Sequence, residues 1–128
     1  MKSALKIAFI VLLGTVVACD KKEKSLYDQV MDIHDEVMPK MDDIQKLRKQ
    51  MKDSLANNPD FSIEKKTEIE GAISDLETAR KSMMDWMHNF NPPEQTDKEA
   101  FQKYMETELV SVKKMREDVL GTLEKFKK

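Results

Sequence analysis

Both histidines and most of the ten methionines of this 128-residue chain fall in two short segments. Thioether sulfur and imidazole nitrogen suit Cu(I), so the two segments predict a copper or silver site. A structural interpretation competes, because methionine is an adaptable core residue that packs well against aromatic rings. A methionine-rich surface for flexible partners is a third alternative. The candidate metal ligands are Met31, His34, Met38, Met84, Met87 and His88.

The chain contains no recognisable catalytic constellation. The run His34-Asp35-Glu36 lacks the second histidine one turn later that zinc peptidases need. Gly71 and Gly121, the only glycines after residue 18, fall inside predicted helices, so no phosphate-binding loop is expected. A serine nucleophile needs a histidine base with an orienting carboxylate, and no serine has that neighbourhood. We therefore expect no enzymatic activity.

The single cysteine of the chain, Cys19, occupies a distinctive place near the N-terminus. It follows the small residue Ala18 and the apolar run 7–17, which is preceded by Lys2 and Lys6. This arrangement resembles the lipobox of bacterial lipoproteins. The resemblance implies a signal peptide over residues 1–18, cleavage before Cys19, and a covalent lipid on its sulfur. A transmembrane helix would need about 20 apolar residues, and an ordinary secretory signal would not need a cysteine after the cut.

Removal of residues 1–18 would leave one small domain with a weakly acidic charge. The signal holds two of the 22 basic residues and none of the 24 acidic ones, which leaves 20 against 24. This balance disfavours nucleic acid as a partner. The expected partners are a lipid membrane, reached through acylated Cys19, and another envelope protein. Stable anchoring takes two acyl chains.

The expected location is the cell envelope, at the inner or the outer membrane and facing the periplasm. Asp20 resembles the inner-membrane retention signal of enterobacterial lipoproteins. That rule is not general, so the choice of membrane stays open.

Three long amphipathic segments follow a charged tether at residues 19–24. Apolar residues recur every three or four positions and predict helices over about 25–56, 62–90 and 96–127. Two proline-containing stretches, 57–59 and 91–93, end the first two helices. Pro39 lies inside the first helix and predicts a kink. Short loops between long helices predict an all-α, antiparallel, up-down-up three-helix bundle over residues 25–128, with coiled-coil-like packing.

Several local contacts follow from these helices. Ser62 is the expected N-cap of the second helix, and the stretch 96–99 has the form of a capping box in which Thr96 caps the third. Glu77 and Lys81, four positions apart, are expected to form an ion pair. If the chain reverses near residues 59 and 93, His34 lies level with Met84 and Met105 lies close to residue 82.

The segments 33–41 and 83–87 resemble those of small helical envelope lipoproteins of the Bacteroidetes group, some of which are labelled as similar to viral A-type inclusion protein. The resemblance covers most of the chain after Cys19 and implies an envelope location without any catalytic residue. In that group a lysine- and acid-rich stretch after the cysteine can resemble an export signal. Residues 21–24 have one acid among three lysines, which leaves export open.

Two functions are consistent with the sequence. The first is a membrane-anchored, non-enzymatic envelope lipoprotein whose helices serve as an interaction or structural module without a cofactor. The alternative is a periplasmic lipoprotein that binds copper or silver through the methionine–histidine cluster.

Overall fold

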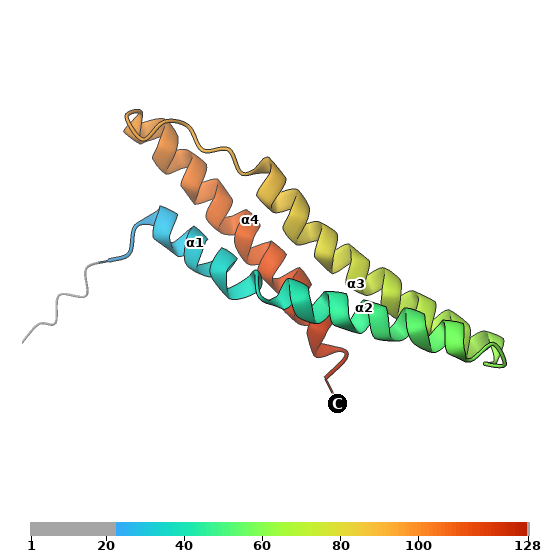
Figure 1. Ribbon diagram of the computed structural model, residues 1–128. Helices are drawn as coiled ribbons and strands as arrows, with labels where there is room; N and C mark the ends of the chain where they lie inside the picture. Colours follow the sequence, from blue (N-terminus) through green and yellow to red (C-terminus); the bar gives the residue numbers. More distant parts are fainter. Residues whose placement is uncertain (1–22, 128) are drawn as a thin grey trace, which may run out of the picture.

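The computed structural model describes residues 23–127, and every regular element in this range is an α-helix (Figure 1). The all-helical class expected from the sequence is therefore confirmed. Cys19, the tether up to residue 22 and the expected signal peptide lie outside the described residues. Within residues 23–127, no helix has the length and apolar character needed to cross a bilayer. The helices are α1 (Leu26–Val37), α2 (Lys40–Asn57), α3 (Ile63–Asn89) and α4 (Lys98–Glu124).

Helices α1 and α2 together form the bent first helix, and they meet at Met38 and Pro39. Proline has no N–H group, and its ring clashes with the carbonyl of the preceding turn, so regular α-helical bonding stops there. The Met38 amide still donates to the His34 carbonyl oxygen at 2.8 Å. The Met41 amide reaches only three residues back, to the Met38 oxygen at 3.1 Å. The predicted kink is thus a tight turn between two helices.

Side chains cap the N-termini of α1, α3 and α4. Ser25 and Ser62 each accept a hydrogen bond from the backbone amide three residues on, at 3.1 and 3.2 Å, which confirms the cap predicted for Ser62. Helix α4 is capped by Asp97, whose Oδ1 accepts from the Ala100 amide at 3.1 Å. The prediction that Thr96 caps this helix is wrong. An ionised carboxylate interacts more strongly than a hydroxyl with the positive end of the helix dipole.

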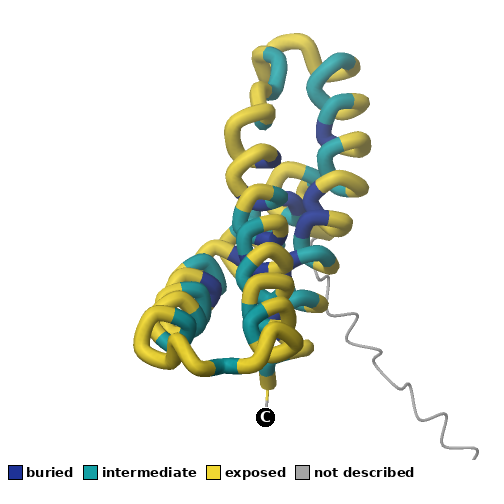
Figure 2. Tube along the Cα trace, turned by 90° about the vertical axis from the view of Figure 1, so that its right-hand side faces the viewer, coloured by how far each residue is buried: buried dark blue, intermediate teal, exposed yellow. Residues whose placement is uncertain are grey.

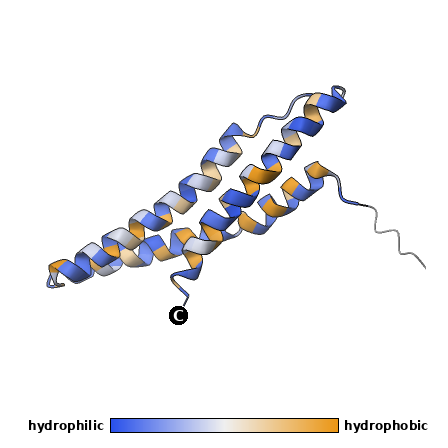
Figure 3. Ribbon diagram, turned by 180° about the vertical axis from the view of Figure 1, so that it is seen from behind, coloured by the Kyte–Doolittle hydropathy of each residue, from blue (hydrophilic) through white to orange (hydrophobic). Residues whose placement is uncertain are grey.

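The core lies where α4 packs between α1 and α3. Helices α1 and α3 are fully described and have no pair of Cα atoms within 8 Å, so α4 separates their backbones. Seen from behind, apolar segments of α1 and α4 face each other (Figure 3). Their burial, with that of α3, supplies the main driving force for folding. The fully buried side chains are Val30, Val37, Ile44, Leu76, Met83, Met105, Val112 and Val119.

The register between α3 and α4 differs from the one that the sequence predicted. Each position of α3 lies beside an α4 residue several positions later in the chain than a tight turn near residue 93 would give. Ser82 Oγ donates to Asp118 at 3.2 Å, and Trp86 Nε1 donates to Glu108 at 3.0 Å. The expectation that Met105 lies close to residue 82 is therefore wrong. The cause is the connection over residues 90–97, which leaves α3 with an extended residue, Phe90. This connection runs on past the end of α3 before α4 begins, so it is no tight turn (Figure 1).

The displacement of α4 leaves the α2–α3 hairpin projecting beyond the end of α4 (Figure 1). We define residues 45–75 as the hairpin tip. Ile44 is the last buried residue before it and Leu76 the first after it, and no residue between them is buried. The tube coloured by burial shows the tip as two helices without dark blue positions (Figure 2). The part of the hairpin that lies beyond the end of α4 therefore has only two-helix packing.

Candidate functional site

His34, one of the predicted metal ligands, is largely enclosed. Its side chain is 18 % exposed, and Nδ1 lies 2.9 Å from Oδ1 of Asp35. Its ring packs on Trp86 of α3, with 5.9 Å between the ring centroids. This ring contact joins two helices whose backbones do not touch. His34 thus packs between α1 and α3, and its Nδ1 atom interacts with the Asp35 carboxylate.

The methionines of the predicted cluster are more open than the histidine between the helices. Met38, Met84 and Met87 are 42 %, 45 % and 37 % exposed, while Met31 is half-buried. The remaining candidate, His88, is exposed. Three thioethers and one imidazole therefore face solvent, where a soft ion has access to them.

Helix geometry separates the α3 candidates from His34. On α3, the ring of Trp86 contacts His34. Met84 and His88 each lie two positions from Trp86, which at about 100° per residue places them on roughly the opposite side of α3. Met31, His34 and Met38 share one side of α1, because they are three and four positions apart. The three candidates of the first helix therefore lie on one side of α1. Met84 and His88 lie on the side of α3 that faces away from His34.

Histidine, cysteine and carboxylate side chains form no metal-binding group of their own in the part of the chain that the structure describes. No group of three or more His, Cys, Asp or Glu side chains there is placed to hold a metal ion. A site of that kind would need carboxylate, imidazole or thiolate groups within a common coordination sphere.

An aromatic chain beside His34 was missed at the level of the sequence. Trp86 packs on Phe90, and Phe90 packs on Tyr104, with ring centroids 5.1 and 6.0 Å apart. The Tyr104 hydroxyl accepts a hydrogen bond from the Asn91 amide at 2.7 Å, and burial raises the pKa of this hydroxyl. The chain fixes the start of the 90–97 connection against α4. Its signal in the sequence is the Trp-x-x-x-Phe spacing, which places both rings on one side of α3.

A groove opens between α2 and the C-terminal end of α4, with a volume of about 570 Å³. We call it the α2–α4 groove. Its apolar lining is formed by Leu47 of α2 and by Leu120, Leu123 and Phe126. Charged residues of both signs, from α1, α2 and α4, form the rim. Binding sites are typically concave and apolar with a few polar groups, so this groove is a candidate for recognition.

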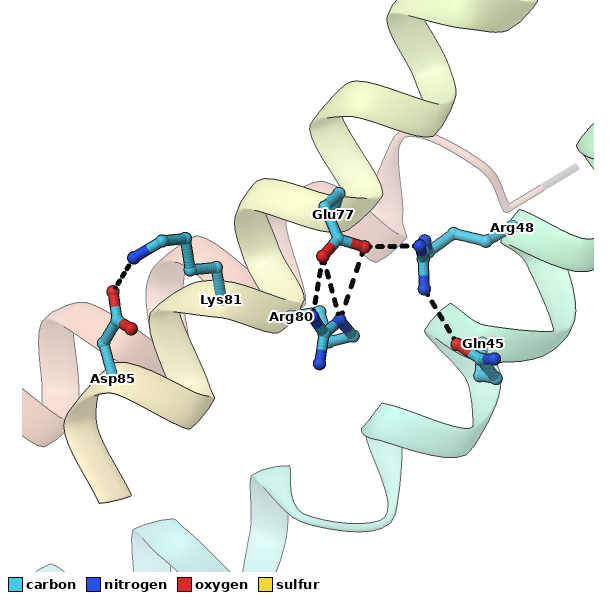
Figure 4. Close-up of polar contacts among 6 residues, drawn as sticks. All are labelled: Gln45, Arg48, Glu77, Arg80, Lys81 and Asp85. Atoms are coloured by element: carbon cyan, nitrogen blue, oxygen red, sulfur yellow. Dashed lines mark hydrogen bonds and ion pairs between the residues drawn. The ribbon is translucent and has the colours of Figure 1, made fainter. Parts of the chain in front are cut away.

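A polar network joins α2 and α3 at the base of the hairpin tip (Figure 4). Glu77 pairs with Arg48 across the two helices and accepts from Arg80 Nη2 at 2.7 Å. The predicted pair of Glu77 with Lys81 is wrong, because Lys81 pairs with Asp85 instead. Arginine offers a planar fork of donors that fits a carboxylate better than an ammonium group does. The network therefore ties the hairpin together and offers no reactive group.

Comparisons with protein-family models, with curated proteins and with solved structures gave no match. Conclusions on function therefore rest on the residues and their geometry.

Proposed function

We propose that the protein is a lipid-anchored envelope protein whose helical domain is a non-enzymatic interaction or structural module. The observation that carries this proposal is the hairpin tip. Its apolar stripe, which includes Met51, Leu55 and Ile69, remains half exposed because α4 ends beside Asp75. An amphipathic helix pair gains stability when a further apolar surface covers such a stripe. A module built for docking retains this kind of surface.

We further infer that the helices form an antiparallel up-down-up bundle, with α1 and α2 as one arm. The contacts between α3 and α4 support this topology. Asp75 pairs with Lys125, and Trp86 bonds to Glu108, so residue numbers rise on α3 as they fall on α4. The short connection 58–62 between α2 and α3 also favours antiparallel neighbours.

The position of the tip supports a role at a distance from the membrane. Helices α1 and α2 contain 12 and 18 residues, which corresponds to a length of about 45 Å at 1.5 Å per residue. The N-terminal end of α1 and the α2–α3 connection lie at opposite ends of this arm (Figure 1). If Cys19 carries the lipid, the tip projects away from the bilayer. This arrangement is in keeping with the resemblance to helical envelope lipoproteins of the Bacteroidetes group.

Metabolic labelling with an alkyne analogue of palmitate tests the anchor. We expect the wild-type chain to take up the label and to sediment with membranes, because one or more acyl chains give it affinity for a bilayer. Cys19→Ala should lose the label and stay unprocessed. Ala18→Gly keeps a small residue before the cysteine and serves as the matched control. Label incorporation by Cys19→Ala would refute lipidation at this position.

A second candidate function is soft-metal binding, and the exposure of the thioethers favours it. The α1 group of Met31, His34 and Met38 offers two sulfurs and one nitrogen on one side of a helix. Cu(I) competition titration tests this candidate on the purified protein. We expect His34→Ala to weaken Cu(I) binding at least tenfold and His88→Ala to leave it unchanged. If the double replacement of both histidines has no effect, the candidate fails.

A further inference from the structure

Ile63 is the most exposed large hydrophobic residue in the described part of the chain, at 80 %. It is the first residue of α3 and follows the connection at the end of the hairpin tip. Acidic residues flank it, with Asp60 before it and Glu64 after it. A single exposed apolar side chain is ordinary on protein surfaces. Ile63 gains significance only if a matching apolar surface exists.

The α2–α4 groove has the properties of such a surface. Leu47, Leu123 and Phe126 contribute to an apolar lining, and the volume of about 570 Å³ exceeds what one aliphatic side chain needs. The space is therefore sufficient for the turn that carries Ile63. Burial of this turn would remove apolar surface from water on both sides of the contact.

Once ion pairs within residues 23–127 are discounted, the groove rim keeps one cation, whereas the turn at residues 58–66 keeps two anions, Asp60 and Glu64, and one cation, Lys66. At the rim, Lys40 pairs with Asp43, Lys127 pairs with Glu124, and Arg116 pairs with Glu36. Lys46, also at the rim, forms no ion pair within residues 23–127. At the tip, Glu64 likewise forms no ion pair with a described residue. A free cation at the groove thus complements a free anion beside Ile63.

We propose that the α2–α4 groove is the docking site for the hairpin tip of a second copy of this chain. In this two-fold arrangement Ile63 of each copy enters the groove of the other, and Glu64 approaches Lys46 of the other copy. Because each copy offers the same groove and the same turn, reciprocal insertion uses both contacts and closes the assembly as a dimer.

Reciprocal docking also covers the half-exposed stripe of the tip. The two tips lie alongside each other between the two grooves, so Met51, Leu55 and Ile69 of each copy face the other copy. Four helices then pack where each copy alone has two. Stable interfaces bury about 1,200 Å² or more in total, and the groove together with the stripe offers two separate apolar areas toward that requirement.

This inference deepens the proposed role as an interaction module by naming its partner. It does not depend on the lipid at Cys19, and the labelling experiment tests the anchor separately. The dimer and the lipid anchor can therefore be refuted independently of each other.

Sedimentation equilibrium of the full chain, in a detergent matched to the solvent density, measures the association. We expect the wild-type chain to dimerise and Ile63→Glu to raise the dissociation constant at least tenfold. Val110→Glu is the matched control, because Val110 is 70 % exposed on α4 and the charge change is the same. This control should dimerise like the wild type. Circular dichroism should show equal helix content in all three.

A charge exchange tests the orientation of the two copies. Lys46→Glu and Glu64→Lys should each weaken the dimer when studied alone, because like charges then meet across the contact. An equimolar mixture of the two variants should recover dimerisation. In the mixed dimer the introduced carboxylate at position 46 faces the introduced ammonium group at position 64, and the second contact retains the native pair. Absence of recovery in the mixture would refute the contact between Lys46 and Glu64.

Two other outcomes overturn the proposal outright. If the wild-type chain dimerises with a dissociation constant above about 1 mM, a second copy does not occupy the groove. This holds whether or not Cys19 carries lipid. If Ile63→Glu associates as tightly as the wild type, the copies meet through another surface, such as the N-terminal segment.

Discussion

The two ends of the α2–α3 hairpin differ in packing although their sequences follow the same pattern. At one end, residues 76–89 of α3 lie against α4 and contribute Leu76, Ala79, Met83 and Trp86 to the core. At the other end, residues 63–75 continue the same spacing with Ile69, Ala72 and Ile73, and none of these is buried. The presence of α4, rather than the apolar pattern of α3, makes the difference.

This contrast shows what an amphipathic period does and does not determine. A repeat of three and four positions establishes that a helix has an apolar face. It does not establish which neighbour covers that face or how far the neighbour extends. The tip therefore has the apolar pattern of a packed helix. Among the described residues, no third helix covers its apolar face. Such a region is suited to an intermolecular contact.

The largest difference between the two ends should appear on truncation of matched leucines. Leu76 is fully buried, and we expect Leu76→Ala to lower the free energy of unfolding by about 2–5 kcal/mol. Leu55, half-buried in the tip, should lose about 1 kcal/mol or less when replaced by alanine, because its side chain retains contact with water. Urea unfolding of both variants measures the two losses. Equal losses would mean that the tip is packed as well as the core.

Native-state hydrogen exchange should separate the same two regions without any mutation. Amides around Met83 and Val112 are expected to exchange only on global unfolding, because their helices bury these side chains fully. Amides of the tip should exchange through local opening at a lower free energy. The Ile63→Glu variant provides the reference, since we expect this substitution to disrupt the proposed dimer. Uniform protection across α3 in that variant would contradict the contrast.

Much of this architecture could be predicted from the sequence because helix formation and helix breaks are local. The periodic stripes, the cap at Ser62 and the kink at Pro39 depend on residues within a few positions of each other. The register of α4 could not be predicted, because it depends on the path of residues 90–97. That path is set by a contact of Asn91 with Tyr104, which is distant in sequence.

The candidate site divides in the same way. The side shared by Met31, His34 and Met38 follows from their spacing on one helix. The packing of His34 on Trp86 depends on how α1 and α3 are placed around α4, and sequence spacing contains no such information. The α2–α4 groove could not be anticipated for the same reason. It exists because α4 ends part-way along the hairpin.

Loss of the helix caps should have a moderate effect that differs between the two ends. Ser62→Ala and Asp97→Ala each remove a side-chain acceptor for a backbone amide, worth about 1 kcal/mol. We expect Asp97→Ala to lower the thermal midpoint, because α4 contributes to the core over most of its length. Ser62→Ala should chiefly increase exchange of amides in the tip and leave the midpoint nearly unchanged. Equal shifts of the midpoint would show that the tip unfolds together with the core.

The smallest expected effect concerns Glu77, which stands at the boundary between the two regions. Hydrogen bonds from Arg80 and the charge of Arg48 hold the pKa of this carboxyl below its ordinary value of 4.5. The folded state therefore binds a proton less readily than the unfolded state. The stability that these contacts contribute is fully present above pH 4.5 and is lost as the pH falls through the lowered pKa.

Glu77→Gln should accordingly cost a few tenths of a kcal/mol at neutral pH, because the side chain is 40 % exposed and solvent screens its ion pairs. The cost should shrink as the pH falls below 4.5, because protonation of the wild-type carboxyl removes the charge that the arginines contact. Urea unfolding of both proteins at pH 7 and pH 3 measures the change. Glu70→Gln is the control, since Glu70 is exposed on α3 and forms no ion pair with residues 23–127. If Glu77→Gln behaves like this control at both pH values, the network does not hold the hairpin together.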